Sequence, residues 1–141
     1  MYYRNHCIIA NSVAIAGHVT LGDYAILGGL SAIHQFVKIG AHSMISGGTL
    51  IRKDIPPFVK AAKEPASFIG INSIGLRRRG FEADKISEIQ NIYRHIFQSN
   101  QNISQAIKSI DKEFSNSKEK EKILSFIEKS ERGIMKGYSS K

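Results

Sequence analysis

Residues 7–57 read CIIANSVAIAGHVTLGDYAILGGLSAIHQFVKIGAHSMISGGTLIRKDIPP. Every sixth position of this stretch is aliphatic, without exception or insertion: Ile9, Ile15, Leu21, Leu27, Ile33, Ile39, Ile45 and Ile51. The residue two places before each of these is small or apolar: Cys7, Val13, Val19, Ala25, Ser31, Val37, Ser43 and Thr49. A period of six fits neither an amphipathic helix nor an alternating strand, and it is typical of a parallel β-helix built from hexapeptide repeats.

Each hexad is predicted to form one short strand and one tight corner. The aliphatic side chain points inward, and the small residue that often follows it is expected to let the chain turn without a Cβ clash. Three hexads complete one triangular coil, so residue n lies under residue n+18, and coils stack at about one strand spacing, roughly 4.8 Å. Two inward columns follow from this register: Ile9, Leu27 and Ile45, and Ile15, Ile33 and Ile51.

A different pattern begins after the hexads. Pro56 and Pro57 cannot donate to a β-ladder, and residues 58–68 are interpreted as a linker or transition. Apolar periodicity and capping residues predict four helices, over 72–79, from 82 or 84 to 98, over 102–114 and over 117–132. Residues 118–122 are expected on a solvated face of the last helix. The tail from residue 137 is expected to fray. The sequence therefore predicts a β-helix in residues 1–57 and a small α-helical C-terminal domain in residues 58–141.

Composition restricts the possible partners. The net charge of +8 favours a phosphate-bearing ligand or an acidic protein. No nucleic-acid-binding module, Walker A motif or dinucleotide fingerprint is recognisable. The single cysteine, Cys7, excludes an internal disulfide and is expected to be a buried thiol. Without a signal-peptide pattern or an apolar run of membrane-spanning length, the cytoplasm is the expected compartment.

Two groups of residues are candidates for chemistry. The first group is His18, at an outward position, with His34 and Gln35. The imidazole of His34 fills a repeat position that usually holds a tiny residue, and this departure from the repeat suggests a function. His6, His42 and His95 are interpreted as structural or surface residues. A zinc site would need three converging histidines, which the hexad register does not provide, so no metal is expected. Arg77, Arg78 and Arg79 form the densest basic cluster, from which a pair suits a diphosphate.

Several segments together resemble the acyl-[acyl-carrier-protein]–UDP-N-acetylglucosamine O-acyltransferase (LpxA) family. They are IAGHV (15–19), GGLSAIHQF (28–36), IGAH (39–42), DIPPF (54–58), GINSIGLRRRGF (70–81) and SERGI (130–134). The resemblance implies a left-handed β-helix and a homotrimer with active sites between subunits. It also implies transfer of a 3-hydroxyacyl group from acyl carrier protein to the glucosamine 3-hydroxyl, the first step of lipid A biosynthesis, without a cofactor.

The resemblance assigns roles to individual residues. Gly17 would supply an oxyanion-binding N–H group, His18 and Gln35 would contact the sugar, and His34 would line the same cleft. The nucleotide and its diphosphate would be held by Asn72, Arg78 and Arg79. Gly47 falls where the family measures the acyl chain, and a glycine there implies a long donor. Basic residues of the helical region would meet acyl carrier protein, among them Lys85, Arg94 and Lys108.

The sequence also departs from the family. No residue matches the general-base histidine, which the family carries one or two hexads before Cys7, and Ile74 stands where the family often has an acidic residue. Because the first hexad is already in register, we expect coils to be missing upstream or their edge to be covered by a partner. The chain alone is therefore predicted to be inactive. The alternatives are a trimeric binding module without catalysis, a γ-type carbonic anhydrase and an acetyl-CoA transferase.

Overall fold

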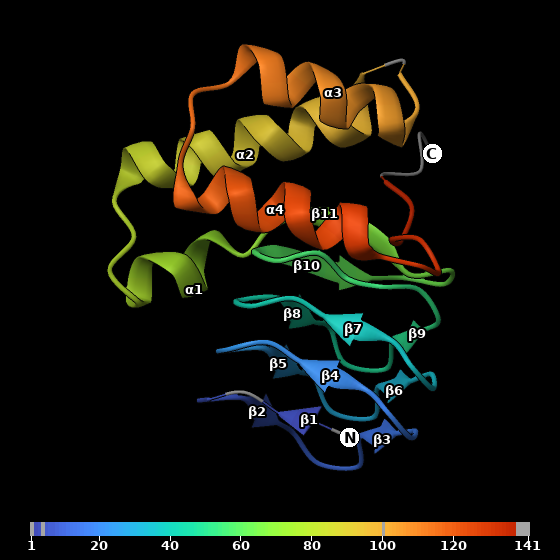
Figure 1. The fold of residues 1–141 in the computed structure, drawn as a ribbon. Helices are drawn as coiled ribbons and strands as arrows, with labels where there is room; N and C mark the ends of the chain where they lie inside the picture. The colour runs from blue at the N-terminus through green and yellow to red at the C-terminus, as the bar shows by residue number, and fades with distance from the viewer. Residues whose placement is uncertain (1, 4, 100, 138–141) are drawn as a thin grey trace.

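A computed structural model of the chain describes residues 2–3, 5–99 and 101–137. A three-sided β-solenoid forms one end of the molecule, and helices cover the other end (Figure 1). Two-residue strands recur at six-residue intervals along the solenoid: β1 (Tyr2–Tyr3), β2 (Ile8–Ile9), β3 (Ala14–Ile15), β4 (Thr20–Leu21), β5 (Ile26–Leu27), β6 (Ala32–Ile33), β7 (Lys38–Ile39), β8 (Met44–Ile45) and β9 (Leu50–Ile51).

Three parallel sheets form the sides of the solenoid. The first side is β1–β4–β7, the second contains β2–β5–β8, and the third is β3–β6–β9. Ile9 pairs with Leu27 and Leu27 with Ile45, while Ile15 pairs with Ile33 and Ile33 with Ile51. This register of 18 residues confirms both predicted columns.

Three corners join the sides: corner 1 (residues 5–6, 23–24 and 41–42), corner 2 (11–12, 29–30 and 47–48) and corner 3 (17–18, 35–36 and 53–54).

The inward residues of the later coils make a buried core. Leu21, Leu27, Ile39, Ile45 and Ile51 are at most 1 % exposed. Cys7, expected to be buried, is half-buried, and its Sγ donates to the carbonyl oxygen of Gly22 at 3.2 Å.

The small residues after the aliphatic positions are required for a different reason from the expected one. A Cβ atom on Gly22, Gly28 or Gly40 would lie only 2.4–2.5 Å from a backbone nitrogen of the next coil. Coil spacing, and not the turn, therefore excludes a side chain there. The turns themselves use positive φ angles two residues further on, and most of those residues have side chains: His6, Ser12, His18, Tyr24, Leu30, Phe36 and His42.

The interpretation of residues 58–68 as a linker is wrong. Strand β10 (Val59–Ala62) resumes the ladder two residues after the proline pair and pairs in parallel with β8. Strand β11 (Ser67–Ile71) then folds back antiparallel on β10. The prolines lie where the chain turns towards the second side, and the Ser43 hydroxyl donates to the Pro56 carbonyl at 2.7 Å. The prolines interrupt the ladder only at this corner, because the edge of β8 remains available to the next segment.

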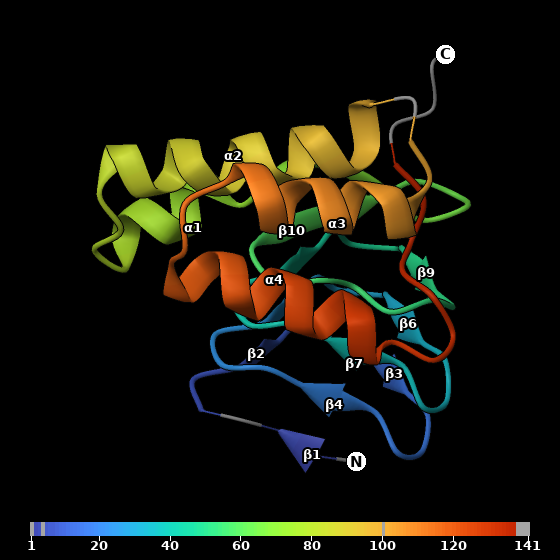
Figure 2. The ribbon, with the colours of Figure 1, turned by 45° about the horizontal axis from the view of Figure 1, so that its top comes forward.

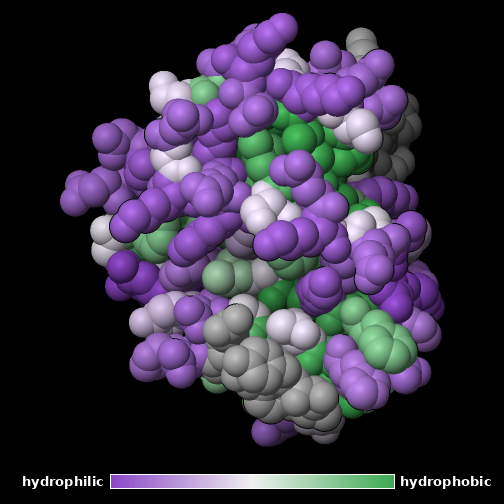
Figure 3. All heavy atoms as spheres, in the orientation of Figure 1, coloured by the Kyte–Doolittle hydropathy of each residue, from purple (hydrophilic) through white to green (hydrophobic). Residues whose placement is uncertain are grey.

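The helices cover the hairpin and the last coil (Figure 2). They are α1 (Ser73–Arg78), α2 (Ala83–Gln98), α3 (Ile103–Glu113) and α4 (Lys118–Lys129), and among the described residues no helix has the length and apolar character needed to cross a membrane. On α2, Tyr93 and Phe97 place their rings 5.6 and 4.6 Å from the ring of Phe68 on β11. The face of Figure 3 has mostly hydrophilic helix surfaces, with apolar atoms between α3 and α4.

The capping residues behave differently from one helix to the next. Asn102 caps α3 in a capping box with Gln105, and Ser117 caps α4, as expected. Asn72 precedes α1, but its side chain makes no capping bond; its Nδ2 instead donates to the His42 carbonyl at 3.0 Å. Helix α4 ends at Lys129, earlier than the expected residue 132. Of the tail expected to fray from residue 137, residues 138–141 lie outside the described residues.

Lys120 contradicts the expected solvated face of residues 118–122, because it is only 3 % exposed. Its Nζ donates to the carbonyl oxygens of Asp111 and Phe114, at 3.1 and 2.8 Å, and to Oδ1 of Asn116 at 3.2 Å. The ammonium group thus satisfies backbone acceptors at the end of α3, where helical carbonyls have no partner within the helix. It ties α4 to the preceding helix.

We expect Lys120→Met to destabilise the fold by about 2 kcal/mol. The variant keeps most of the apolar stem but leaves the part-buried acceptors at the end of α3 without this donor. Urea unfolding followed by circular dichroism measures the change. Lys118→Met, at the exposed start of the same helix, is the control. Equal unfolding midpoints for the two variants would contradict the assigned role of Lys120.

Candidate functional site

Corner 3 brings together the residues predicted to contact the sugar. His18 occupies the left-handed turn position, with φ of 60°, and its ring stacks on Phe36 of the next coil at 4.9 Å. The amide of Phe36 donates to the carbonyl of Gly17 at 3.1 Å, so the turns of the two coils are joined directly. His34 and Gln35 precede Phe36 in the upper turn and are exposed.

A groove of about 350 Å³ runs beside His18 at this corner. Its walls come from the first side of the solenoid and from the segment after α4, and they are formed by His18, Phe36, Lys38, Asp54, Glu131 and Arg132. Sequence reasoning did not find Asp54, Glu131 and Arg132, because they lie far along the chain from His18. Their only sequence signals were two segments of the resemblance without an assigned role: DIPPF, which contains Asp54, and SERGI, which contains Glu131 and Arg132.

Corner 1 holds a second group of polar residues. The rings of His6, Tyr24, His42 and Phe58 stack on one another through four levels, with centroids 4.8, 5.1 and 5.7 Å apart. Arg79 lies across this column, with its guanidinium carbon 5.0 Å from the centre of the Tyr24 ring. Its Nη1 is 3.2 Å from Nδ1 of His42. Because a guanidinium group can only donate, Nδ1 of His42 is the acceptor.

Burial, together with the positive charges of Arg79 and Lys122, lowers the pKa of His42 to about 4, against a smaller opposing effect of Asp23. The imidazole is therefore neutral at pH 7 and able to accept from Arg79. Sequence reasoning treated His42 as structural or surface. The signal that was available is the spacing of 18 residues from Tyr24, which places an aromatic ring directly below it.

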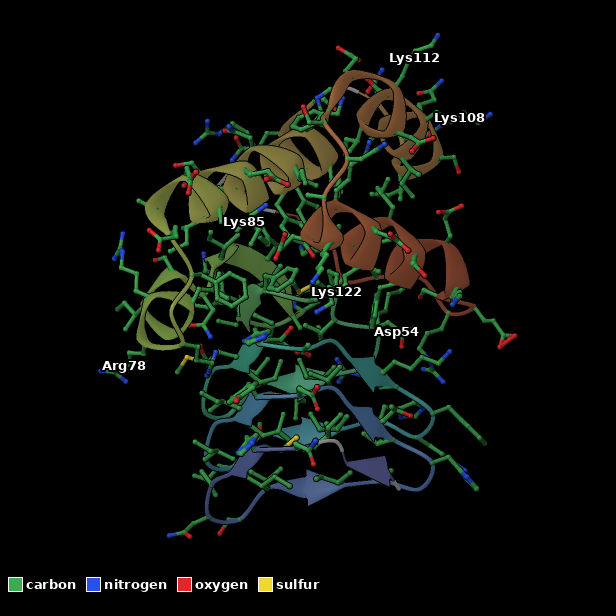
Figure 4. All side chains as sticks on the ribbon, turned by 60° about the vertical axis from the view of Figure 1, so that its left-hand side comes forward. Asp54, Arg78, Lys85, Lys108, Lys112 and Lys122 are labelled. Carbon is green, nitrogen blue, oxygen red and sulfur yellow. The ribbon has the colours of Figure 1, made fainter. Side chains whose placement is uncertain are left out.

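The nucleotide-binding candidates surround the same corner. Asn72 is 3 % exposed and donates to the carbonyl of His42, and a Cβ on Gly75 would lie 2.6 Å from Nδ2 of Asn72. Gly75 therefore leaves space for the amide. Asn72 and Arg79 both bind the corner itself, whereas Arg78 is exposed and extends away from the solenoid (Figure 4).

One chain does not bring all the candidate residues together. Gly17, His18, His34 and Gln35 are at corner 3, Gly47 is exposed at corner 2, and the polar group of Asn72 and Arg79 is at corner 1. A whole side of the solenoid separates each corner from the next. Among the described residues, no three His, Cys, Asp or Glu side chains form a group able to hold a metal ion.

The basic residues expected to meet an acidic protein do not form one patch. Lys85 makes ion pairs with Glu88 and Glu119, at 3.1 and 3.2 Å. Lys108 lies with Lys112 at the other end of the helical region from Lys85 (Figure 4). Arg94 is exposed on α2, and its Nη1 donates to Oδ1 of Asn91 at 3.4 Å.

The chain is similar to known proteins over nearly its whole length. The family model described as "Udp N-acetylglucosamine O-acyltransferase; Domain 2" matches residues 54–135. The acyl-[acyl-carrier-protein]–UDP-N-acetylglucosamine O-acyltransferase of Thiobacillus denitrificans is 40 % identical over 129 residues, which are 92 % of this chain and 50 % of that protein. The same enzyme of Burkholderia orbicola is 49 % identical over 102 residues, 72 % of this chain and 39 % of that protein.

Solved structures agree with this similarity. LpxA of Bacteroides fragilis superposes with a TM-score of 0.93 at 45 % identity, covering 95 % of this chain and 52 % of that one. UDP-N-acetylglucosamine acyltransferase of Campylobacter jejuni gives a TM-score of 0.89 at 36 % identity, covering 97 % and 53 %. The expected left-handed β-helix followed by helices is confirmed. The chain spans about half the length of the curated relatives it matches.

Protonation of His42 is expected to weaken the fold as the pH falls. Its folded pKa, about 4, lies below the ordinary value of 6.5, so the unfolded chain binds more protons between these values. Stability should be insensitive to this group above pH 6.5 and decline from there towards pH 4. Urea unfolding of the parent and of His42→Asn at pH 7.5, 6.0 and 4.5 measures the difference.

The His42→Asn variant should lose less stability than the parent over this range, whatever its stability at pH 7.5. His18→Asn, at an exposed position, controls for the loss of a histidine and should follow the parent. If His42→Asn follows the parent as well, the neutral His42 ring is not the source of the pH dependence.

Proposed function

Because this chain belongs to the UDP-N-acetylglucosamine O-acyltransferase family, we propose that it serves the first step of lipid A biosynthesis. In that reaction a long-chain 3-hydroxyacyl group passes from acyl carrier protein to the 3-hydroxyl of UDP-N-acetylglucosamine. The observation that carries the proposal is the family match across residues 54–135, together with the superposition of 95 % of the chain on LpxA at a TM-score of 0.93. The proposal also places the chain in the cytoplasm.

The division of the candidate residues among three corners supports a homotrimer. In one chain a whole side of the solenoid separates a sugar contact at corner 3 from a diphosphate contact at corner 1, so the two would serve one ligand when they come from different copies. A contact between unlike surfaces closes into a ring when copies are related by rotation, and three copies would form three equal sites. Apolar side chains on the outer faces agree with such contacts: Ile8 is 57 %, Met44 36 % and Leu50 39 % exposed.

Within each site the residues would have different roles. His18, His34 and Gln35 would hold the sugar, and the N–H of Gly17 would stabilise the oxyanion that forms when the sugar hydroxyl attacks the thioester carbonyl. Arg78 would bind the diphosphate, since it is exposed, while Arg79 already donates to His42 and would support it from the corner. Gly47 would leave space for a long acyl chain.

The resemblance gives no residue of this chain the role of removing the proton from the sugar hydroxyl. No residue of the sequence matches the general base, and without one the attacking oxygen stays a weak nucleophile. This observation favours a second candidate function, a trimeric module that binds acyl carrier protein or nucleotide without catalysis. Both functions require trimerisation and ligand binding, and only the first includes acyl transfer.

We expect the purified 141-residue chain to form a trimer, three times 15.7 kDa, to bind UDP-N-acetylglucosamine, and to show no acyl transfer. Light scattering, isothermal titration calorimetry and a thioester assay with 3-hydroxyacyl carrier protein test the three parts. Arg78→Ala should weaken nucleotide binding about tenfold, the loss of one charge-assisted contact. Arg94→Ala, which removes an exposed arginine on α2, should leave it unchanged.

A monomer that binds no UDP-N-acetylglucosamine would refute the proposed site and the binding module together. Measurable turnover by the parent chain would refute the prediction that it is inactive alone. Equal binding by Arg78→Ala and the parent would remove Arg78 from the diphosphate site.

A further inference from the structure

The segment Ser130–Lys136 follows α4 and returns to the solenoid; we name it the C-terminal strap. Two backbone hydrogen bonds join the strap to Asp54 of corner 3. The Asp54 amide donates to the Gly133 carbonyl, and the Met135 amide donates to the Asp54 carbonyl, each at 3.0 Å. Its far end accepts from the amide of Phe68 at Lys136, at 2.9 Å. The strap therefore connects the helical region to the corner that carries His18, His34 and Gln35.

Arg132 makes the most specific contacts of the strap. Its Nη2 donates to the carbonyl oxygen of Gln35 and its Nη1 to the carbonyl oxygen of Arg52, both at 2.9 Å. These two carbonyls belong to successive coils: Gln35 is in corner 3, and Arg52 directly precedes that corner. A planar guanidinium with fixed donor directions can hold both at once, whereas an ammonium group is a single point of donation.

Asp54 completes the attachment from below the strap. It is 2 % exposed, and its Oδ1 accepts from the amide of Lys38 at 2.9 Å while its Oδ2 accepts from the Ser130 hydroxyl at 2.6 Å. Both oxygens of this buried carboxylate thus have a donor, one from the solenoid and one from the strap. The backbone is held on each side of Phe36, at Gln35 by Arg132 and at Lys38 by Asp54.

We propose that Arg132 is a positioning residue for the nucleotide-sugar site, an inference that rests on the proposed function. It fixes the turn that presents His34 and Gln35, and through Phe36 it fixes the ring on which His18 stacks. Contacts held in place before binding cost less conformational entropy when the ligand arrives. The strap in this way links the helical region to the substrate corner of the same chain.

The test compares Arg132→Ala and Arg132→Lys with Lys129→Ala, an exposed residue at the end of α4. Amide hydrogen exchange of Phe36, Val37 and Lys38 should rise at least tenfold in Arg132→Ala, and the His42 amide at corner 1 should exchange as in the parent. UDP-N-acetylglucosamine affinity should fall about tenfold, the scale of one lost charge-assisted bond. Arg132→Lys should recover only part of both effects, and Lys129→Ala should show neither.

A merely structural role would lower the melting temperature and raise exchange at both corners equally, and that result would overturn the proposal. Unchanged sugar-nucleotide affinity in Arg132→Ala would overturn it as well. If the parent binds no UDP-N-acetylglucosamine, the proposed function fails and the substrate part of the inference fails with it. The exchange pattern then still decides whether Arg132 fixes corner 3, so the two failures are distinguishable.

Discussion

The hydrogen bond between stacked coils is the interaction on which the rest of this structure depends. An amide of one coil donates to the carbonyl seventeen residues later, as from Ile8 to Ala25 at 2.9 Å and from Ala14 to Ser31 at 3.0 Å. Keeping this spacing brings backbones so close that a side chain on Gly22, Gly28 or Gly40 would collide with the next coil. It also brings every corner residue under its counterpart 18 positions on, which is why His18 meets Phe36 and Tyr24 meets His42.

The helical region protects the last coil and connects to it through polar contacts that are buried and fully paired. Tyr93 donates its hydroxyl to the carbonyl of Pro57 at 2.5 Å, and Asp54 accepts from both the solenoid and the strap. Lys120 makes the same kind of contact within the helical region. A buried charge is unfavourable unless it is paired in one geometry, so such groups favour one arrangement of the strap and helices over others. These bonds join the helical region to the last coil, in addition to the ring contacts of Phe68 with Tyr93 and Phe97.

The hexad register could be predicted from the sequence because it is a local, repeated pattern. The same register of 18 residues places His18, Gln35 and Gly47 at their corners. The capping residues Asn102 and Ser117 could also be predicted from the sequence. The hairpin of β10 and β11 was not, because Pro56 and Pro57 signal an end to pairing while the open edge of β8 is a tertiary feature. The contact of Arg132 with Gln35 joins residues that are 97 positions apart in the sequence, so no local sequence pattern predicts it.

The distribution of candidate residues over three corners has a physical consequence for how this fold can carry a site. A triangular solenoid has convex corners, and a corner offers a ligand contacts from one direction only. Most ligand sites are concave, so a corner needs a second surface opposite it. At corner 3 the strap provides part of that surface through Glu131 and Arg132, and it does so from the same chain. At corner 1 the end of α1 provides Arg78 and Arg79, but the residues at corner 3 are a whole side away. A ligand with a sugar at one end and a nucleotide at the other would therefore bridge corners of neighbouring copies, and its affinity would depend on assembly as well as on the residues themselves.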